Sequence, residues 1–210
     1  MISTLYKVYH KGEKHMKVQI IIGSTRPGRA TPKIAQWVAN ESKNLGIDDV
    51  EILDLADYEL PFFDEIAPPQ YNPERKPNTV AKKWLEKLAA GDAYVLVTPE
   101  YNRSTSGVLK NALDYLDFQF NHKPVTLVGH GSTGGAQAVA GLRATLSGVK
   151  AAVLPTVTYF SEQAGAVIDE SGNLDEKVKA NPYGPHGALQ ATLEELKWYG
   201  EALETARAKD

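Results

Sequence analysis

Short uninterrupted runs of aliphatic and β-branched residues alternate along the chain with longer amphipathic stretches. Such runs are typical of strands that are buried on both faces of a parallel sheet. The predicted strands are residues 17–22, 50–53, 93–98, 125–128 and 149–154. The predicted helices are residues 33–45, 80–89, 108–118, 136–146 and 187–207. Five strand-helix repeats predict an α/β fold with a doubly wound parallel sheet in three α/β/α layers.

Length and composition favour one domain. The chain has 210 residues, of which 42% are hydrophobic, so one well-buried core is expected over residues 16–210. Residues 1–15 are polar and are expected to form a poorly ordered N-terminal extension, with a short edge strand over residues 5–9 as the alternative. Residues 58–78 and 158–186 are long for connections, so each is expected to be functional or part of an interface.

Charge and cysteine content exclude several classes of protein. The net charge is −3 with scattered basic residues, so neither nucleic acid nor an anionic membrane is an expected partner. The chain has no cysteine, which excludes disulfides and thiolate chemistry and is typical of a reducing compartment. We therefore expect a cytoplasmic protein. His122 and His186 have no nearby partners at metal-ligand spacing, so no metal is expected.

The loop after the first predicted strand combines glycines, hydroxyls and arginines. It reads GSTRPGRAT over residues 23–31 and leads into a helix with Pro32 at a favoured first position. Free amides at a helix N-terminus, together with guanidinium groups, attract phosphate. We predict a phosphate site made by Ser24, Arg26 and Arg29, with a plain turn and solvated arginines as the alternative. Arg29 followed by alanine lacks the Lys-Ser/Thr pair of a nucleoside-triphosphate loop.

Two further loops follow later predicted strands. Residues 98–107 read TPEYNRSTSG and lead into VLKNALDYL. Residues 129–135 read GHGSTGG, which satisfies the dinucleotide pattern GxGxxG. That pattern is weak here, because it belongs after the first strand and needs an acidic residue about 20 positions further on. A lone histidine such as His130 is more often a structural hydrogen-bonding residue than an acid.

The three loops resemble, in the same order, those of the NADPH-dependent FMN reductase and quinone reductase family. The family hallmark is PEYN followed by S-x-P-G-x-LKNAIDW, and its phosphate loop begins GS-x-R. The resemblance covers residues 17–154. It has two departures. Ser106 stands where the family usually has proline, which is expected to loosen the turn, and Arg29 stands where many members have serine.

The resemblance implies a flavodoxin-like fold with a five-stranded sheet in the order 2-1-3-4-5. It also implies FMN as the cofactor, NADPH or NADH as the electron donor, and a homodimer or homotetramer. The implied activity is reduction of quinones, flavins or similar small acceptors by ping-pong hydride transfer through FMN. The alternative is an FMN-binding redox sensor or electron carrier without NAD(P)H turnover. A second rival is a dinucleotide-binding oxidoreductase that uses the third loop.

The same resemblance implies a set of site residues but no catalytic side chain, because the flavin carries the chemistry. The implied cofactor-binding residues are Ser24, Arg26, Arg29, Pro99, Glu100, Tyr101, Asn102, Ser132, Gly134 and Gly135. Amides at Gly134 and Gly135 would face a flavin carbonyl. Glu100 is either a general base, which hydride transfer does not need, or a solvent-facing or interface carboxylate. Tyr115, Phe118 and Phe120 are expected at a dimer interface, with core packing as the alternative.

Overall fold

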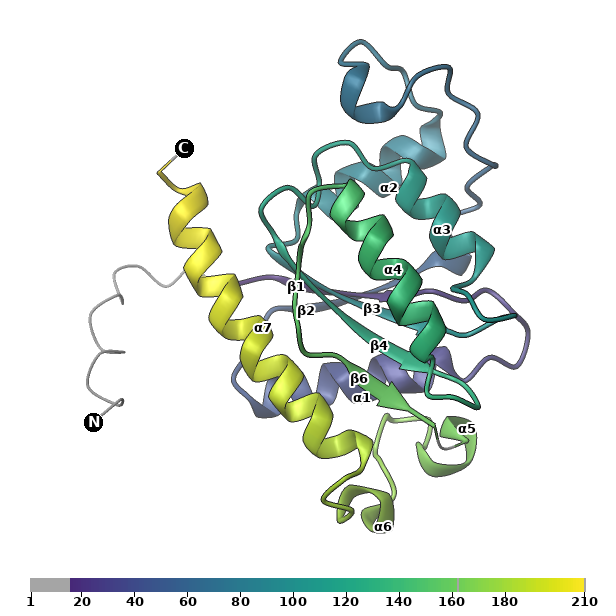
Figure 1. The fold of residues 1–210 in the computed structure, drawn as a ribbon, viewed down its shortest axis with the longest axis vertical. Helices are drawn as coiled ribbons and strands as arrows, with labels where there is room; N and C mark the ends of the chain where they lie inside the picture. The colour runs from purple at the N-terminus through teal and green to yellow at the C-terminus, as the bar shows by residue number, and fades with distance from the viewer. Residues whose placement is uncertain (1–15, 162, 210) are drawn as a thin grey trace.

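A parallel sheet forms the centre of the computed structural model, which describes residues 16–161 and 163–209 (Figure 1). Its strands are β1 (Val18–Ile22), β2 (Val50–Asp54), β3 (Ala93–Pro99), β4 (Pro124–His130), β5 (Ala152–Val153) and β6 (Thr158–Phe160). The order is β2-β1-β3-β4-β5, with β6 also paired to β4, and every pair is parallel. The predicted order 2-1-3-4-5 is therefore confirmed. The predicted extension over residues 1–15 lies outside the described residues.

The fifth strand position is interrupted. β5 pairs with the first residues of β4, and β6 pairs with its last three. Between them the chain leaves the ladder, and the Arg143 guanidinium donates to the carbonyls of Leu154 and Pro155, at 2.8 Å each. The predicted strand over 149–154 is thus shorter than expected and is continued by β6. The segment 158–186 also contains two short helices, α5 (Ala164–Val167) and α6 (Glu176–Lys179).

Two layers of helices cover the sheet (Figure 1). One face carries α1 (Thr31–Asn44) and α7 (Pro185–Arg207), and the other carries α2 (Thr79–Ala89), α3 (Gly107–Asp114) and α4 (Ala136–Gly148). The strands contribute to both buried clusters, as expected for continuous apolar runs. Among the described residues, no helix is long and apolar enough to cross a membrane.

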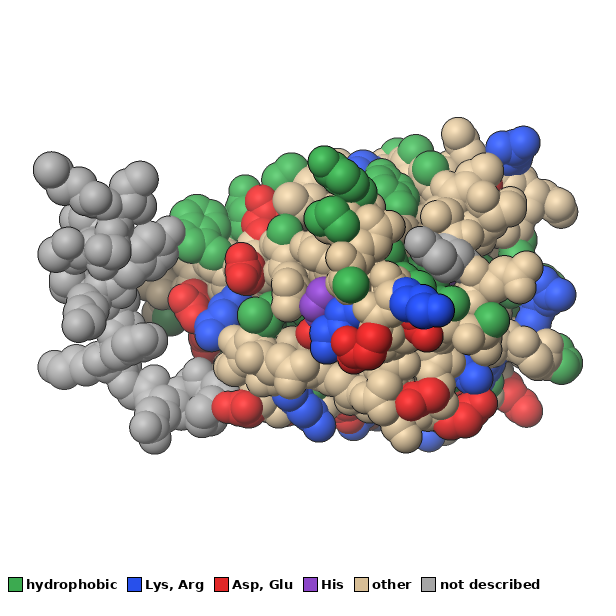
Figure 2. All heavy atoms as spheres, turned by 90° about the horizontal axis from the view of Figure 1, so that it is seen from below, with side chains coloured by type: hydrophobic (Ala, Val, Ile, Leu, Met, Phe, Trp, Pro, Cys, Tyr) green, Lys and Arg blue, Asp and Glu red, His purple; other side chains and the backbone are tan. Residues whose placement is uncertain are grey.

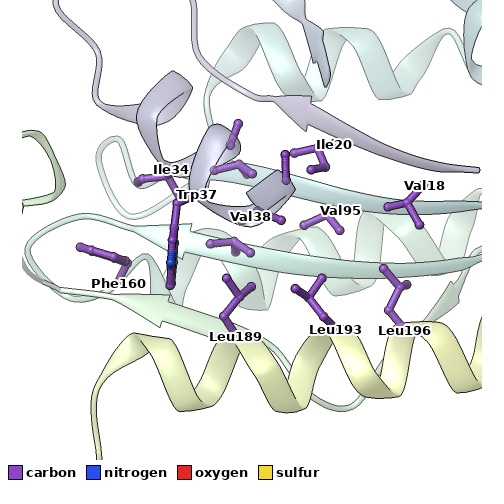
Figure 3. Close-up of a cluster of buried hydrophobic side chains, with 14 of the residues drawn as sticks. Val18, Ile20, Ile34, Trp37, Val38, Val95, Phe160, Leu189, Leu193 and Leu196 are labelled. Atoms are coloured by element: carbon purple, nitrogen blue, oxygen red, sulfur yellow. The ribbon is translucent and has the colours of Figure 1, made fainter. Parts of the chain in front are cut away.

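One hydrophobic core lies between the sheet and the helices α1 and α7. Trp37 of α1 packs edge-on against Phe160 of β6, with 5.5 Å between ring centroids. Figure 3 shows Leu189, Leu193 and Leu196 of α7 lined up below the strands. Full burial of one such side chain contributes about 1.5–3 kcal/mol. The opposite core contains Trp84, Leu85 and Leu88, as their helical spacing predicts.

The segment 58–78 is fixed to α3 by hydrogen bonds. It follows a 3-10 turn, η2 (Leu55–Asp57), and contains another, η3 (Pro69–Tyr71). The Asn111 side chain accepts from the Phe63 amide at 2.9 Å and donates to the Pro61 carbonyl at 2.8 Å. The Tyr115 hydroxyl donates to the same carbonyl at 3.1 Å. The asparagine of the LKNALDYL motif therefore holds this segment against the helix.

A buried arginine fixes the far part of the same segment. The Arg75 guanidinium donates to both carboxylate oxygens of Glu65, at 2.8 and 2.5 Å. It also reaches Asp117 at 3.1 Å and the Tyr115 carbonyl at 2.8 Å. A bidentate pair of this kind restricts geometry more than a single bond does. The long connection is therefore an ordered part of the domain surface.

The aromatic residues after α3 divide between core and surface. Tyr115 and Phe120 are fully buried within the chain, so core packing, the alternative to an interface role, is confirmed for both. Phe118 is 54% exposed. Elsewhere, on the face at the lower end of Figure 1, acidic and basic side chains are interspersed (Figure 2).

Candidate functional site

Three loops meet at one edge of the sheet. Ile22 of β1 pairs in register with Val97 of β3, and Pro99 at the end of β3 pairs with His130 at the end of β4. Because the strands are parallel, their carboxyl ends lie together, and ligands of such sheets bind outside these ends. We name the connections loop 1 (residues 23–30), loop 2 (residues 100–106) and loop 3 (residues 131–135). All ten predicted site residues lie on these loops or at a strand end.

Loop 1 presents an uncapped helix start. Ala30 at the N-cap of α1 provides no side-chain hydrogen bond, and Pro32 lies in the first turn. Pro32 has no amide hydrogen, and the Ile34 amide donates to the Ala30 carbonyl at 3.3 Å. The Thr31 and Lys33 amides are therefore the ones left for an anion. Arg26 is exposed, with its guanidinium carbon 5.0 Å from the centroid of the Tyr101 ring. Amides without a side-chain cap and an exposed guanidinium are groups that fit a phosphate monoester.

Arg29 of loop 1 has partners of its own. It donates to the Asp54 carboxylate at 2.5 Å and to the Ser24 carbonyl at 2.6 Å. Asp54 ends β2, so this ion pair ties loop 1 to the neighbouring strand. To bind a phosphate, Arg29 would have to share its guanidinium between Asp54 and the phosphate. Sequence reasoning missed Asp54, and its place at a predicted strand end was the one available signal.

Ser24 and Tyr101 contact each other. Ser24 is fully buried, and its hydroxyl lies 2.8 Å from the Tyr101 hydroxyl. The Arg26 amide donates to the same serine oxygen at 3.5 Å. The structure therefore joins two predicted cofactor residues in a contact between loops 1 and 2. The phosphate contact of the Ser24 side chain stays a prediction.

Loop 2 turns through two residues with positive φ. Asn102 and Arg103 have φ of 50° and 67°. The Tyr101 amide donates to the Ser104 carbonyl at 2.8 Å, and the Ser104 amide donates back at 3.0 Å. Positive φ at both central residues is the signature of a type I′ turn. Asn102 is exposed on this turn, whereas Pro99 is buried at its base.

Ser106 tightens loop 2. Its hydroxyl oxygen accepts from the Leu109 amide at 3.1 Å, which caps α3, and the hydroxyl donates to the Gly23 carbonyl of loop 1. Its φ of −66° is the value that a proline ring imposes. The serine thus keeps the backbone conformation of the usual proline and adds a bond between loops. The expectation that it loosens the turn is wrong.

Glu100 joins loop 2 to loop 3. Its carboxylate accepts from the Thr133 hydroxyl and from the Gln137 amide in the first turn of α4, both at 2.9 Å. Burial opposes ionisation of this group, but the amides of Gln137 and Ala138 and the Thr133 hydroxyl hold its pKa below the ordinary value. The Glu100 amide also donates to the His130 carbonyl at 2.9 Å. These contacts make Glu100 the acceptor at the N-terminus of α4.

The occupied N-terminus of α4 argues against the dinucleotide-binding rival. That reading needs free amides at the helix after the GxGxxG loop, where a pyrophosphate would bind. The Glu100 carboxylate already takes this position. The groups that remain to attract a phosphate are therefore those of loop 1 and the start of α1.

The glycines of loop 3 are required by the loop itself. Gly134 and Gly135 are buried, with φ of 69° and 80°. A Cβ on Gly135 would lie 2.5 Å from the His130 amide nitrogen, which no side chain tolerates. The pair therefore lets loop 3 fold closely onto the end of β4. The Gly134 amide donates to the Gly131 carbonyl at 2.9 Å, so it already has a partner within loop 3 and is not free to face a flavin carbonyl as expected. Ser132 is exposed on the same loop, and contacts of Ser132 and Gly135 with a cofactor stay predictions.

His130 connects the end of β4 to α1. Its Nε2 lies 3.0 Å from the hydroxyl of Thr31, the first residue of that helix. Burial lowers the pKa of His130 to about 4. The imidazole is therefore neutral at ordinary pH and acts as a hydrogen-bonding partner, the structural role that the sequence favours.

A cavity of about 340 Å³ opens beside loop 1. Its lining residues are Thr25, Leu55, Ala56, Tyr58, Glu59, Leu60, Val108 and Asn111. A volume of this order is sufficient for part of a small ligand. The segment 58–78 therefore borders the functional edge of the molecule, which supports a functional role for that long connection.

A sheet in this order, with an anion-attracting loop after β1 and two loops beside it, defines a flavodoxin-like domain. The sequence pattern of one family, described as NADPH-dependent FMN reductase, matches residues 16–166, and the chain belongs to this family. It is accordingly an oxidoreductase with FMN as cofactor and NAD(P)H as co-substrate.

Individual relatives agree with this assignment. The chain is 36% identical over 141 residues to an NAD(P)H-dependent FMN reductase of Schizosaccharomyces pombe, covering 67% of this chain and 70% of that protein. It is 38% identical over 145 residues to an NADPH azoreductase of a Bacillus species, covering 67% and 74%. The solved structure of FerB, a flavoenzyme NAD(P)H:(acceptor) oxidoreductase of Paracoccus denitrificans, superposes with a TM-score of 0.68. At 22% identity, over 89% of this chain and 98% of that one, it shows the shared fold alone.

Replacement of Ser106 tests the bond between loops 1 and 2. Ser106→Ala removes the cap of α3 and leaves the buried Gly23 carbonyl without its hydroxyl donor, so we expect a loss of about 1–3 kcal/mol in unfolding free energy. Urea denaturation measures it. Ser104→Ala, at an exposed serine on the same loop, is the control and should change stability by less than about 0.5 kcal/mol. Equal stability of the two variants would contradict the role of Ser106.

The buried histidine predicts a dependence of stability on pH. The folded pKa of His130 lies below the unfolded value, so between about pH 6.5 and pH 4 the unfolded chain binds the extra proton. The unfolding free energy should therefore decrease as the pH is lowered from about 6.5 to 4, by up to about 3 kcal/mol from this residue. His130→Gln should flatten the curve obtained from urea denaturation. His122→Asn, which removes an exposed histidine, should not, and parallel curves for all three proteins would refute the assignment.

Proposed function

We propose that this protein reduces quinones, flavins, azo compounds or similar small acceptors with electrons from NAD(P)H, through FMN bound at loops 1 to 3. The observation that carries the proposal is the uncapped N-terminus of α1 beside the exposed Arg26, in a chain of the FMN reductase family. Several relatives carry the name azoreductase, which supports the inclusion of azo compounds.

In this proposal the chain binds and orients, and FMN supplies the redox chemistry when bound, taking a hydride from NAD(P)H and passing two electrons to the acceptor. Arg26 and the first amides of α1 hold the FMN phosphate. Tyr101 lies between that phosphate site and the type I′ turn, where it would border the flavin. Glu100 keeps its hydrogen bonds to loop 3 and α4 and holds no proton for the reaction, which fits hydride chemistry.

Donor and acceptor are proposed to use one site in turn. Loops 1 to 3 converge on a single edge of the sheet, and the oxidised nucleotide would leave before the acceptor enters. Two substrates that alternate in this way give ping-pong kinetics. The alternative, an FMN-binding sensor or electron carrier, lacks the turnover that this scheme requires.

The test combines cofactor binding with turnover. FMN fluorescence should be quenched on titration with the protein, and the loaded protein should oxidise NADPH when a quinone or an azo dye is supplied, with parallel double-reciprocal plots. Arg26→Ala removes a charge-assisted bond worth about 1.5–3 kcal/mol, so FMN should bind about 10- to 100-fold more weakly.

Arg29→Ala is the matched comparison for Arg26. Because Arg29 is paired with Asp54, Arg29→Ala should lower the unfolding free energy of the protein by more than it lowers the free energy of FMN binding. Bound FMN without NAD(P)H oxidation would favour the electron-carrier alternative. Absence of FMN binding by the unaltered protein would refute the proposal.

We further propose that the chain forms a homodimer or homotetramer through one apolar surface. Its side chains, Phe62, Ile66, Tyr71 and Phe118, are exposed and lie on the segment 58–78 and just beyond α3. Figure 1 shows this segment at the top, away from α6. Large apolar side chains exposed on one part of a molecule are typical of an interaction surface, and the family resemblance supports a second copy. The expected cytoplasmic location also stays a proposal.

Charge introduced into this surface should dissociate the assembly. Ile66→Asp places a carboxylate in the proposed interface, which costs several kcal/mol of desolvation when buried, so the molar mass from light scattering should fall to that of the monomer. Tyr183→Asp, at another exposed aromatic residue near α6, is the control. A monomeric unaltered protein, or an unchanged mass for Ile66→Asp, would contradict the proposed surface.

A further inference from the structure

Two arginines at the functional edge differ from their basic neighbours. Most basic side chains on loop 1, α1 and α3 have a carboxylate partner. These pairs are Arg29 with Asp54, Lys33 with Glu170 and Lys110 with Asp114. Arg26 and Arg103 are exposed, and within the described residues neither guanidinium forms an ion pair or a hydrogen bond. Two guanidinium groups are thus available to anions from solution.

Folding does not explain an arginine at position 103. Its φ of 67° lies in the left-handed region, which costs a residue with a Cβ roughly 1–2 kcal/mol. Glycine or asparagine would satisfy the type I′ turn more easily. The exposed side chain gains no hydrogen bond or ion pair in return within the described part of the chain. Unfavourable backbone at a ligand-binding edge points to a function of the side chain.

The turn that carries Arg103 is held rigidly. Both backbone bonds between Tyr101 and Ser104 close it, and the Thr98 and Thr105 hydroxyls lie 2.8 Å apart at its base. The Tyr101 hydroxyl is fixed to buried Ser24. A guanidinium on a fixed turn loses less entropy on binding than one on a mobile loop. The geometry therefore favours recognition of a ligand at a defined position.

Glu100 interacts with the charge of Arg103 but forms no ion pair with it. Burial opposes ionisation of Glu100, but its hydrogen bonds lower its pKa. The positive charge of Arg103 lowers this pKa further, by a smaller amount. Its two carboxylate oxygens accept from Thr133 and Gln137 of loop 3 and α4, at 2.9 Å each. Arg103 therefore keeps a free guanidinium beside the site.

The substrates bring more phosphate than one arginine can bind. FMN has a single phosphate monoester, which Arg26 and α1 accommodate. NADPH differs from NADH in one phosphate monoester, the 2′-phosphate of its adenosine, and arginine matches such a group with paired hydrogen bonds. We infer that Arg103 binds this 2′-phosphate and gives the protein a preference for NADPH over NADH. The inference rests on the proposed function, since it requires the nucleotide to approach loop 2.

The experiment compares Arg103→Asn with a matched control. Asparagine tolerates positive φ, so the turn should persist. Lys150→Asn removes a positive charge from another exposed residue with positive φ, 57°, which lies before β5 at the opposite edge of the sheet. Two probes, 2′,5′-ADP and 5′-AMP, are titrated calorimetrically into the FMN-loaded proteins. Steady-state oxidation of NADPH and NADH is measured in parallel.

We expect Arg103→Asn to weaken 2′,5′-ADP binding tenfold or more and to leave 5′-AMP within twofold. The kcat/KM for NADPH should fall by a similar factor and that for NADH should stay within twofold, whereas Lys150→Asn changes neither. Arg103→Lys should restore part of the affinity. Equal 2′,5′-ADP binding by Arg103→Asn and the unaltered protein would overturn the inference. A tenfold loss of 2′,5′-ADP binding in a protein that oxidises neither nucleotide would support the anion site and refute the proposed function.

Discussion

The pairing of β3 between β1 and β4 is the constraint on which the site depends. Parallel pairing brings the carboxyl ends of the three strands to one edge, and their burial on both faces fixes the register. A shift of one residue would turn every side chain of β3 to the opposite core. The backbone bond from Glu100 to His130 continues this pairing beyond the strand. The positions of loops 1 to 3 therefore follow from the central sheet.

Contacts between the loops determine which groups remain for ligands. Arg29 is paired with Asp54, and the Glu100 carboxylate accepts from an amide at the start of α4. The His130 imidazole is hydrogen-bonded to the Thr31 hydroxyl. Arg29 and the glycine-rich loop before α4 look like ligand-binding candidates when the sequence is considered alone. Their pairing leaves the start of α1 as the available helix N-terminus among the loops described. In the proposed function, phosphate binds at one place partly because the competing groups already have partners within the chain.

The sequence predicted the sheet, its order and the three loops, because continuous apolar runs and the PEYN and LKNALDYL motifs are local signals. It did not predict the break between β5 and β6, which depends on Arg143 bonding two carbonyls from a separate helix. The roles of Glu100 and Ser106 were also missed, since their partners lie 37 and 83 residues away. Such contacts have no periodicity, and one motif position, such as Ser106, can be occupied by chemically different residues with the same φ.

Positive φ is concentrated in loops 2 and 3, at Asn102, Arg103, Gly131, Gly134 and Gly135. The glycines have a steric reason, because loop 3 folds against its own strand, and asparagine tolerates this conformation well. For Arg103, neither packing nor conformational tolerance explains the positive φ. Its unfavourable backbone is maintained by the bonds around Tyr101 and Ser24, which hold the turn whichever residue stands at its tip. The turn is rigid, and it carries a charged residue in an unfavourable backbone conformation. This arrangement is expected where ligand binding, rather than folding, determines which residue stands at position 103.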